Sequence, residues 1–317
     1  LDGFTSDFAI DSEDNIWYTN WSTYSDYENP AGILIKFDRS SWESQLAISP
    51  ETDSLLLQDF IQFFQFPSGM TTPNGVTIGP DQNIWIVDTS SSYFFSFDPV
   101  TEEFTKYVTS IPTIDSYGNA SGFIKSPISR PYWIESSDDK LIMNEHTANR
   151  IGVFNPSTEI LVEYTVPSRN PNWSDCEGIM YCGVAQVFDF AIDGEKIWFT
   201  EWVENNIGVV DTSIPLPFSI DIDTQPIILE KGQTTNVMLQ VSLTSDLTGD
   251  VTISSATTSL FSDIIVTYDV NELLDKSKTI QIQITASENA LPGTHKVLLG
   301  VYNNDIAVSQ FITVTIV

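Results

Sequence analysis

The chain has 317 residues and a formal net charge of −30, which arises from 43 Asp and Glu residues against 13 Lys and Arg residues. This acidity argues against nucleic acid and anionic lipid as partners, because both bind cationic surfaces. With 41% apolar residues the chain can bury a core, and no apolar run approaches the roughly 18–20 residues that span a bilayer.

A sequence pattern recurs four times before residue 217. Its most regular part is a strand-like segment that ends in an acidic or amide residue, at residues 15–20 (NIWYTN), 83–88 (NIWIVD), 140–145 (KLIMNE) and 196–201 (KIWFTE). A second strand-like segment follows and ends at Asp38, Asp98, Asn155 or Asp211. The copies at 145–155 and 201–211 align without a gap.

Each copy predicts a four-stranded antiparallel sheet. Apolar residues on both faces of the strands require each sheet to lie between neighbours, as the blades of a β-propeller do. We therefore predict an all-β protein whose first domain, residues 1–217, holds blades at about 5–67, 73–109, 130–167 and 184–215. The last copy has no clear fourth strand before Pro215.

Four such blades should leave open sheet edges, which proteins avoid. We hypothesise that preceding N-terminal blades lie outside this chain, or that another protein chain supplies blades to complete the propeller. A closed four-bladed ring is the alternative.

A second domain is predicted over residues 218–317. All eight Trp and both Cys lie before it, and the net charge is −7 from residue 218 onward (11 acidic, 4 basic) against −23 before it (32 acidic, 9 basic). Alternating polar and apolar residues indicate seven strands, at 219–223, 236–243, 251–255, 264–269, 279–286, 295–302 and 307–317. This pattern favours an immunoglobulin-like β-sandwich, with spacing or adhesion as its expected role.

Several features favour an extracellular or cell-surface location. The chain begins at Leu1 rather than Met, so we expect either a removed signal segment or a fragment of a longer product. Asn20, Asn119 and Asn172 each begin an Asn-x-Ser sequon and would be glycosylation sites in a secreted protein. Cys176 and Cys182 would form a disulfide in an oxidising compartment, with two free thiols as the alternative.

The repeat Ile-Trp-Phe-Thr-Glu followed by Asn-x-Ile-Gly-Val resembles the streptogramin lyase (virginiamycin B lyase) family. The resemblance covers residues 5–211 and is closest at 140–156 and 196–211. It implies a ring of about seven blades. It also implies an enzyme in which a histidine base and Mg²⁺ held by glutamates open a lactone ring by elimination, with Glu145, His146 and Glu201 at the matching positions.

Two segments depart from that family. Its repeats often read Pro-His-Gly before the first strand, where this chain has Pro73-Asn74-Gly75 and Arg130-Pro131-Tyr132.

His146 is the single histidine of the repeat region, next to Glu145, and its near-neutral pKa would suit a general base. A plain surface histidine is the alternative reading, and His295 falls in a predicted C-terminal strand, where a structural role is expected.

The residues that end the second strand of each copy are the best candidate site. They are Asn20, Asp88, Glu145 and Glu201, and the repeat predicts one structural position for all four. Around a propeller axis they would line an acidic mouth whose oxygen atoms could hold Mg²⁺ or Ca²⁺. The alternative is that they accept hydrogen bonds from the backbones of neighbouring blades.

The sequence thus favours a secreted or cell-surface propeller that acts as a binding or scaffold module, with a cell-envelope or glycan partner and a divalent cation at its mouth. The competing hypothesis is a metal-assisted lyase or lactonase that opens a cyclic ester. A third interpretation attributes the charge of −30 to a saline habitat, where it supports solubility and indicates nothing about ligands.

Overall fold

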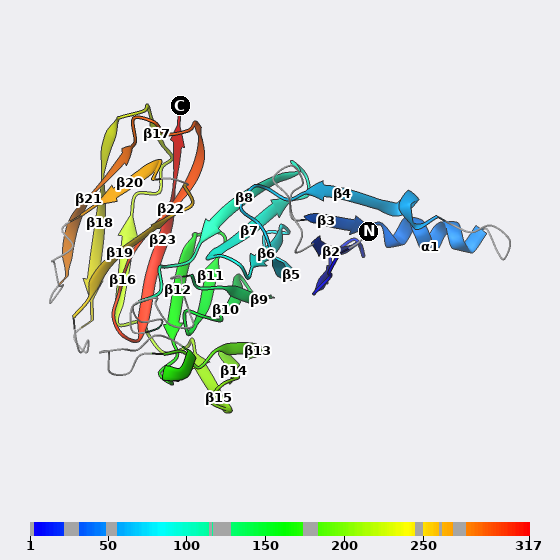
Figure 1. The fold of residues 1–317 in the computed structure, drawn as a ribbon, viewed down its shortest axis with the longest axis horizontal. Helices are drawn as coiled ribbons and strands as arrows, with labels where there is room; N and C mark the ends of the chain where they lie inside the picture. Colours follow the sequence, from blue (N-terminus) through cyan, green and yellow to red (C-terminus); the bar gives the residue numbers. More distant parts are fainter. Residues whose placement is uncertain are drawn as a thin grey trace.

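The computed structural model describes residues 3–21, 32–48, 56–113, 116, 128–173, 183–244, 250–259, 262–268 and 277–317. Cys176, Cys182 and Asn119, and with them the disulfide and one glycosylation site, lie outside these residues. The described chain is built almost entirely of β-strands in several sheets, as a propeller-like protein requires. In Figure 1 the strands of the four copies follow one another along an arc, and the C-terminal strands lie at one side of it.

The four sequence copies form four antiparallel sets of strands, which we call repeat sheets 1 to 4, and the third of them is part of a larger sheet. Sheet 1 contains β1 (Phe8–Ile10), β2 (Ile16–Trp21), β3 (Gly32–Phe37) and β4 (Ile61–Gln65), and sheet 2 contains β5 (Pro73–Ile78), β6 (Ile84–Asp88), β7 (Tyr93–Asp98) and β8 (Glu103–Val108). Sheet 3 contains β9 (Pro131–Ser137), β10 (Lys140–Glu145), β11 (Arg150–Asn155) and β12 (Ile160–Thr165). Sheet 4 has three strands, β13 (Val187–Asp193), β14 (Lys196–Glu201) and β15 (Asn206–Asp211).

Successive repeat sheets pack face to face, which explains why their strands are apolar on both sides. In β6, Ile84 and Ile86 pack against sheet 1, whereas Trp85 and Val87 pack against sheet 3. A third core lies between sheets 3 and 4 and includes Ile142. Because side chains alternate along a strand, each sheet contributes one apolar face to each neighbour.

A helix that the sequence pattern did not predict lies between β3 and β4. Helix α1 (Arg39–Ile48) has no buried residues. Asp38 accepts a hydrogen bond from the backbone N–H of Ser41 (2.9 Å), and Arg39 forms an ion pair with Glu43 one turn later. These local contacts stabilise a helix without an apolar face, which is why hydrophobic periodicity gave no signal. Two short 3₁₀ segments, η1 (Leu57–Phe60) and η2 (Pro171–Trp173), lie before β4 and after β12.

The C-terminal segment forms two sheets around a common apolar core. One has the order β16–β18–β21–β20, from β16 (Phe218–Ile222), β18 (Thr234–Leu243), β20 (Ile264–Thr267) and β21 (Lys278–Ala286). The other contains β19 (Thr252–Thr257), β22 (Gly293–Tyr302) and β23 (Ile306–Ile316), with β17 (Ile227–Leu229) parallel to the end of β23. All seven strands expected from alternation are present, and β17 is an additional one.

The C-terminal segment and repeat sheet 3 share one continuous sheet. Strand β23 pairs antiparallel with β12, from Ile160 opposite Gln310 to Tyr164 opposite Ile306, so the sheet runs unbroken from β9 to β19 (Figure 1). Phe311 of β23 also enters the core between sheets 2 and 3. The outer edge of sheet 3 is therefore covered, which removes an open edge that the repeat would otherwise expose.

Sheets 1 and 4 stand at the two ends of the arc. In the described part of the chain no strand of sheet 1 pairs with a strand of sheet 4, so the arc is not closed by strand pairing. Within the same residues, no helix is both long and apolar enough to cross a membrane.

Candidate functional site

The four residues that end the second strands occupy equivalent positions. In each sheet the next residue donates its backbone N–H to a carbonyl that precedes the first strand: Trp21 to Phe4 (3.0 Å), Thr89 to Thr72 (3.0 Å), His146 to Arg130 (3.1 Å) and Trp202 to Gln186 (3.0 Å). Asn20, Asp88, Glu145 and Glu201 therefore share one backbone environment. Their side chains, however, have different partners.

Asp88 is buried and accepts hydrogen bonds from its own sheet. Its Oδ1 accepts the backbone N–H of Thr72 at 2.6 Å, and its Oδ2 accepts the hydroxyl of Ser91 at 2.6 Å. Each carboxylate oxygen thus has a donor. This arrangement holds the segment before β5 against the turn after β6.

Glu201 and Asn20 differ in their surroundings. Glu201 is buried, and its Oε1 and Oε2 accept hydrogen bonds from Ser168 (3.0 Å) and Asn206 (2.9 Å). Asn20 is half-buried on β2. Glu201 thereby ties β14 to the first residue of β15 and to the segment that follows β12.

Glu145 is completely buried beside a second glutamate, Glu163 of β12. Both oxygens of Glu145 and Oε2 of Glu163 lack a hydrogen-bond donor, whereas Oε1 of Glu163 accepts the backbone N–H of Ser110 (2.9 Å) and lies 3.5 Å from Nη1 of Arg150. Burial, and secondly repulsion from Glu163, raise the pKa of Glu145 well above its ordinary value. A proton on Glu145 supplies the donor for the hydrogen bond that links the two carboxyl groups.

The structure does not gather these candidates into one ligand set. Among the described residues, no group of three or more His, Cys, Asp or Glu side chains lies close enough to hold a metal ion. Asp88 and Glu201 already accept protein hydrogen bonds, and Glu145 faces Glu163 inside sheet 3. Binding of Mg²⁺ or Ca²⁺ at Asn20, Asp88, Glu145 and Glu201 thus stays a prediction.

His146 lies in a cluster of rings at the junction of sheets 3 and 4, which we call the aromatic cluster (Tyr132, His146, Phe188 and Trp202). The His146 ring centre lies 5.7 Å from that of Tyr132 and 6.3 Å from that of Phe188, and the rings of Phe188 and Trp202 lie 5.2 Å apart. Phe188 and Trp202 are exposed, whereas His146 is buried beneath them. The cluster therefore presents an aromatic surface to solvent.

The orientation of the His146 ring is fixed by the backbone. Its Nδ1 lies 2.9 Å from the carbonyl oxygen of Val187, so a neutral ring donates its Nδ1 proton there and leaves Nε2 as the acceptor. Burial, which outweighs the hydrogen bond to Val187, lowers the pKa of His146 below its ordinary value. The neutral imidazole is therefore the form present at neutral pH.

A set of carboxylates that sequence reasoning missed lies along the first strands of the repeat sheets. Asp7 and Glu135 line a cavity of about 380 Å³ between β1, β5 and β9. Burial raises the pKa of Glu135, and repulsion from Asp189 and then Asp7 adds to the effect, while burial also raises the pKa of Asp7. We call Asp7, Glu135 and Asp189 the inner carboxylates.

A sequence signal for two of them was present. The segment Asp-Phe-Ala-Ile occurs at 7–10 and again at 189–192. In both copies the Asp Oδ1 accepts the backbone N–H of the following Phe, at 2.8 Å for Asp7 and 2.9 Å for Asp189. Repeat analysis that had included the residue before each apolar run would have found this pair.

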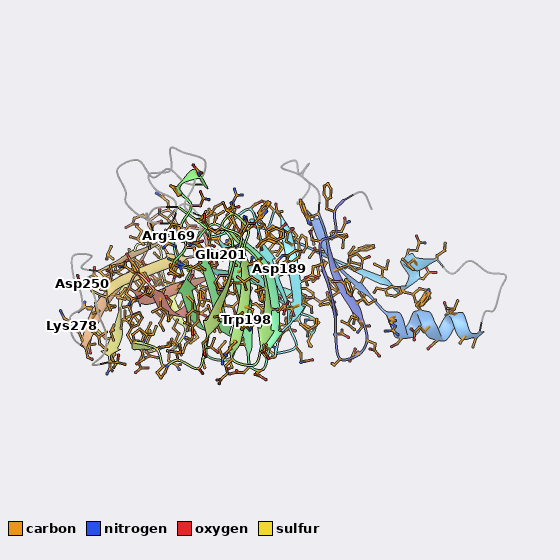
Figure 2. All side chains as sticks on the ribbon, turned by 90° about the horizontal axis from the view of Figure 1, so that it is seen from below. Arg169, Asp189, Trp198, Glu201, Asp250 and Lys278 are labelled. Carbon is orange, nitrogen blue, oxygen red and sulfur yellow. The ribbon has the colours of Figure 1, made fainter. Side chains whose placement is uncertain are left out.

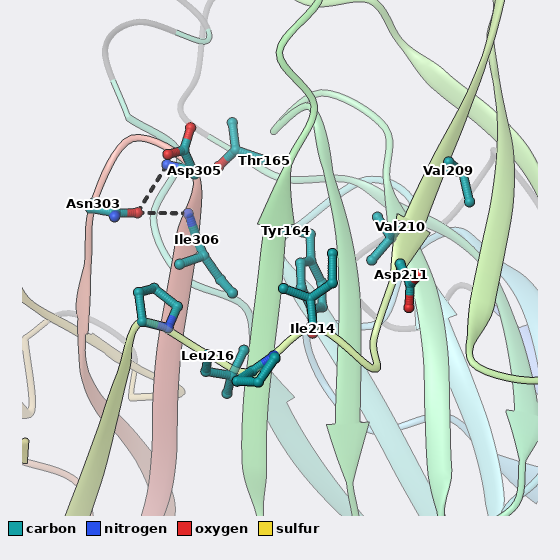
Figure 3. Close-up of a pocket in the computed structure, with 12 residues that line it drawn as sticks. Tyr164, Thr165, Val209, Val210, Asp211, Ile214, Leu216, Asn303, Asp305 and Ile306 are labelled. Atoms are coloured by element: carbon teal, nitrogen blue, oxygen red, sulfur yellow. Dashed lines mark hydrogen bonds between the residues drawn. The ribbon is translucent and has the colours of Figure 1, made fainter. Parts of the chain in front are cut away.

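A second cavity, of about 370 Å³, lies between β12, β15, the linker to β16 and the turn before β23 (Figure 3). Tyr164, Ile214, Leu216 and Ile306 supply its apolar wall, and Asn303 shapes the turn by accepting the backbone N–H groups of Asp305 and Ile306. This cavity lies along the edge of β15 that pairs with no other described strand. In sheets 1 to 3 the corresponding edge is paired with a fourth strand. Of the remaining predicted sites, Asn172 is exposed.

No protein-family model matches the chain, and no curated protein matches it. Among solved structures the chain is similar to a streptogramin B lyase (18% identity, TM-score 0.42, 66% of this chain and 54% of that one) and to virginiamycin B lyase from Staphylococcus aureus (22%, 0.42, 65% and 51%). It is also similar to a catalytically inactive virginiamycin B lyase from Staphylococcus aureus with quinupristin (16%, 0.43, 97% and 80%). The chain spans about half the length of the first two. At these values the likeness concerns the arrangement of sheets alone.

Proposed function

We propose that this protein is a secreted or cell-surface binding and scaffold module, in which the repeat sheets are four blades of a larger propeller. In this proposal the C-terminal sheets form an immunoglobulin-like sandwich, which holds the blade region at a distance from its anchor. The support is structural: sheets 1 to 4 stack in sequence, and β23 fixes the C-terminal sheets to sheet 3.

The ligand proposed for this module is a positively charged group, such as an amine or the lysine side chains of a partner. The inner carboxylates carry this proposal, because Asp7 and Glu135 line one cavity and repulsion from Asp189 reaches Glu135. The net charge of −30 would attract a cation over a distance.

A tetralysine peptide tests this proposal in a calorimetric titration at low and at physiological salt. The double variant Glu135→Gln/Asp189→Asn should weaken binding about tenfold, since one attractive charge is lost in the cavity and a second is lost near Glu135. The matched control Asp138→Asn/Glu195→Gln removes the same charge from exposed turns and should change binding little. Equal weakening by both double variants would show that only the overall charge attracts the peptide, and the cavity proposal would fail.

A second candidate function, a lyase or lactonase acting on a cyclic ester, rests on the orientation of His146. The ring is neutral and presents Nε2 as an acceptor, which is the state required of a general base. The structure provides no second imidazole in the repeat region, because His295 lies in β22. Incubation with a cyclic depsipeptide lactone, with and without Mg²⁺, tests this candidate. Ring opening that His146→Ala abolishes would favour it over the binding role.

A further inference from the structure

One position in the second strand of each repeat sheet faces the sheet that follows it. Trp17 and Trp85 hold this position in sheets 1 and 2, Ile142 in sheet 3 and Trp198 in sheet 4. Trp17 and Trp85 are each only 1% exposed, because the next sheet covers them. Trp198, which is labelled in Figure 2, is 43% exposed on β14 of sheet 4.

The following sheet offers a matching residue at each of these interfaces. Trp17 meets Phe97 of sheet 2, with ring centres 5.9 Å apart, and Trp85 meets Phe154 of sheet 3, with ring centres 5.4 Å apart. Phe97 and Phe154 hold the same register, since each pairs with the first apolar residue of its second strand, Ile84 or Leu141.

The interface between sheets 3 and 4 follows the same rule with smaller side chains. Ile142 replaces the tryptophan, and Val210, which pairs with Ile197, replaces the phenylalanine. Side-chain size is thus matched across all three interfaces. A tryptophan in this position is accompanied by a phenylalanine on the next sheet.

Sheets 4 and 1 lie at the two ends of the arc. The outer face of sheet 4 carries the tryptophan of such a pair, and the outer face of sheet 1 carries the phenylalanine. Sheet 4 presents Trp198, together with exposed Ile207 and Val209. In sheet 1 the register position of Phe97 and Phe154 is held by Phe37, which pairs with Ile16 and also contacts Trp42 of α1, with ring centres 6.0 Å apart. The same face of sheet 1 carries Phe8, Ile10 and Phe63, all exposed.

We propose that two copies of this chain associate end to end, with the outer face of sheet 4 in each copy packed on the outer face of sheet 1 in the other. Trp198 would then contact Phe37 of the second copy, as Trp85 contacts Phe154 within one chain. Two identical contacts related by a twofold axis close a ring of eight sheets, which lies within the four to eight blades typical of propellers. The outer face of sheet 4 and the outer face of sheet 1 can therefore cover each other when two copies of the chain meet.

The proposal is tested by the mass in solution, measured by light scattering and sedimentation from about 1 to 100 µM protein. Salt near 0.15 M or above is needed, because each chain carries a charge of −30. The natural chain should have the mass of two copies at the upper concentrations. A single-chain mass throughout the range would overturn the proposal.

Three variants test which faces form the contact between the two copies. Trp198→Glu on sheet 4 and Phe63→Glu on sheet 1, where Phe63 is 53% exposed, should each give single chains with unchanged circular dichroism. Ile228→Glu on β17, 67% exposed and outside both faces, should leave the dimer intact. A dimer that survives Phe63→Glu would show that sheet 4 does not pair with sheet 1.

Mixing the two single-chain variants gives a further measurement. A mixed pair retains one natural contact, between Trp198 of the Phe63→Glu chain and sheet 1 of the Trp198→Glu chain. Dimers should therefore reappear in the mixture at concentrations where neither variant dimerises alone. Their absence from the mixture would count against the pairing of unlike faces. Neither result depends on the inner carboxylates, so the cation-binding proposal is tested separately.

Discussion

Two buried glutamates show how an acidic residue can belong to the interior of a sheet rather than to a site. Glu145 has no donor for either oxygen, and Glu163 faces it while Arg150 and Ser110 contact the far oxygen of Glu163. Two carboxylates and one guanidinium cannot all be charged at low cost in a dry interior, because burial penalises each unpaired charge. A single shared proton resolves the conflict, and it keeps Glu145 neutral.

This proton makes the stability of the fold depend on pH. The folded pKa of Glu145 lies above the unfolded value of 4.5, so the native state binds more protons than the unfolded state once the pH exceeds 4.5. The free energy of unfolding should therefore fall as pH rises above 4.5, by up to about 1.4 kcal/mol per pH unit until Glu145 loses its proton. Glu145→Gln supplies an amide donor at every pH and should flatten this dependence.

Urea unfolding between pH 4.5 and 8 measures the effect. Glu103→Gln, an exposed substitution on β8, serves as the control and should reproduce the slope of the natural chain. A Glu145→Gln profile with the same slope would contradict the shared proton.

At the level of the strand, glycine and tryptophan explain most of the repeat pattern. Gly152 lies opposite Met143 and Gly208 lies opposite Phe199 in the adjacent strand. A Cβ on Gly208 would come within 2.1 Å of the Phe199 ring, so the Ile-Gly-Val segment makes room for a large side chain on the second strand. In sheets 1 and 2, Trp17 and Trp85 of the second strand fill the space before the next sheet.

Trp85 is the strand residue whose loss should cost most. Trp85→Ala removes a buried ring that contacts Phe94, Tyr107 and Phe154, and should lower the free energy of unfolding by about 3–5 kcal/mol. Val100→Ala in the exposed β7–β8 turn should change it by less than about 0.5 kcal/mol. Chemical denaturation of both variants checks this difference, and equal values for the two would argue against the tight packing of sheets 2 and 3.

For the whole molecule, the sharing of a sheet between the repeat region and the C-terminal segment is the main feature. Strand β23 pairs with β22 on one side and with β12 on the other, and Lys296 of β22 forms an ion pair with Glu159 beside β12. Phe311 adds an apolar contact to the core of sheets 2 and 3. Because these contacts are extensive, neither part can unfold without exposing apolar surface of the other.

We therefore expect one cooperative unfolding transition. Tryptophan fluorescence reports the repeat region alone, since all eight Trp precede residue 217, and hydrogen exchange of β18 and β21 reports the C-terminal segment. The two probes should give the same denaturant midpoint. Separate midpoints would show that the shared sheet does not couple the two parts.

Features that depend on near neighbours along the chain could be predicted from the amino-acid pattern. Apolar residues on both faces of segments such as 83–88 and 196–201 require stacked sheets, and alternation after residue 217 places seven strands. These features arise from the two-residue period of a strand, so a local pattern is enough to predict them. The equivalence of Asn20, Asp88, Glu145 and Glu201 followed in the same way.

Contacts between groups that are distant along the chain could not be predicted and became visible in the fold. Glu145 could not be paired with Glu163, nor β12 with β23, from the sequence, because these contacts join segments that no period relates. The inner carboxylates likewise come together only when the four first strands, β1, β5, β9 and β13, lie side by side. Repetition sets the shape of each sheet, whereas the charges that share a cavity depend on how the sheets are stacked.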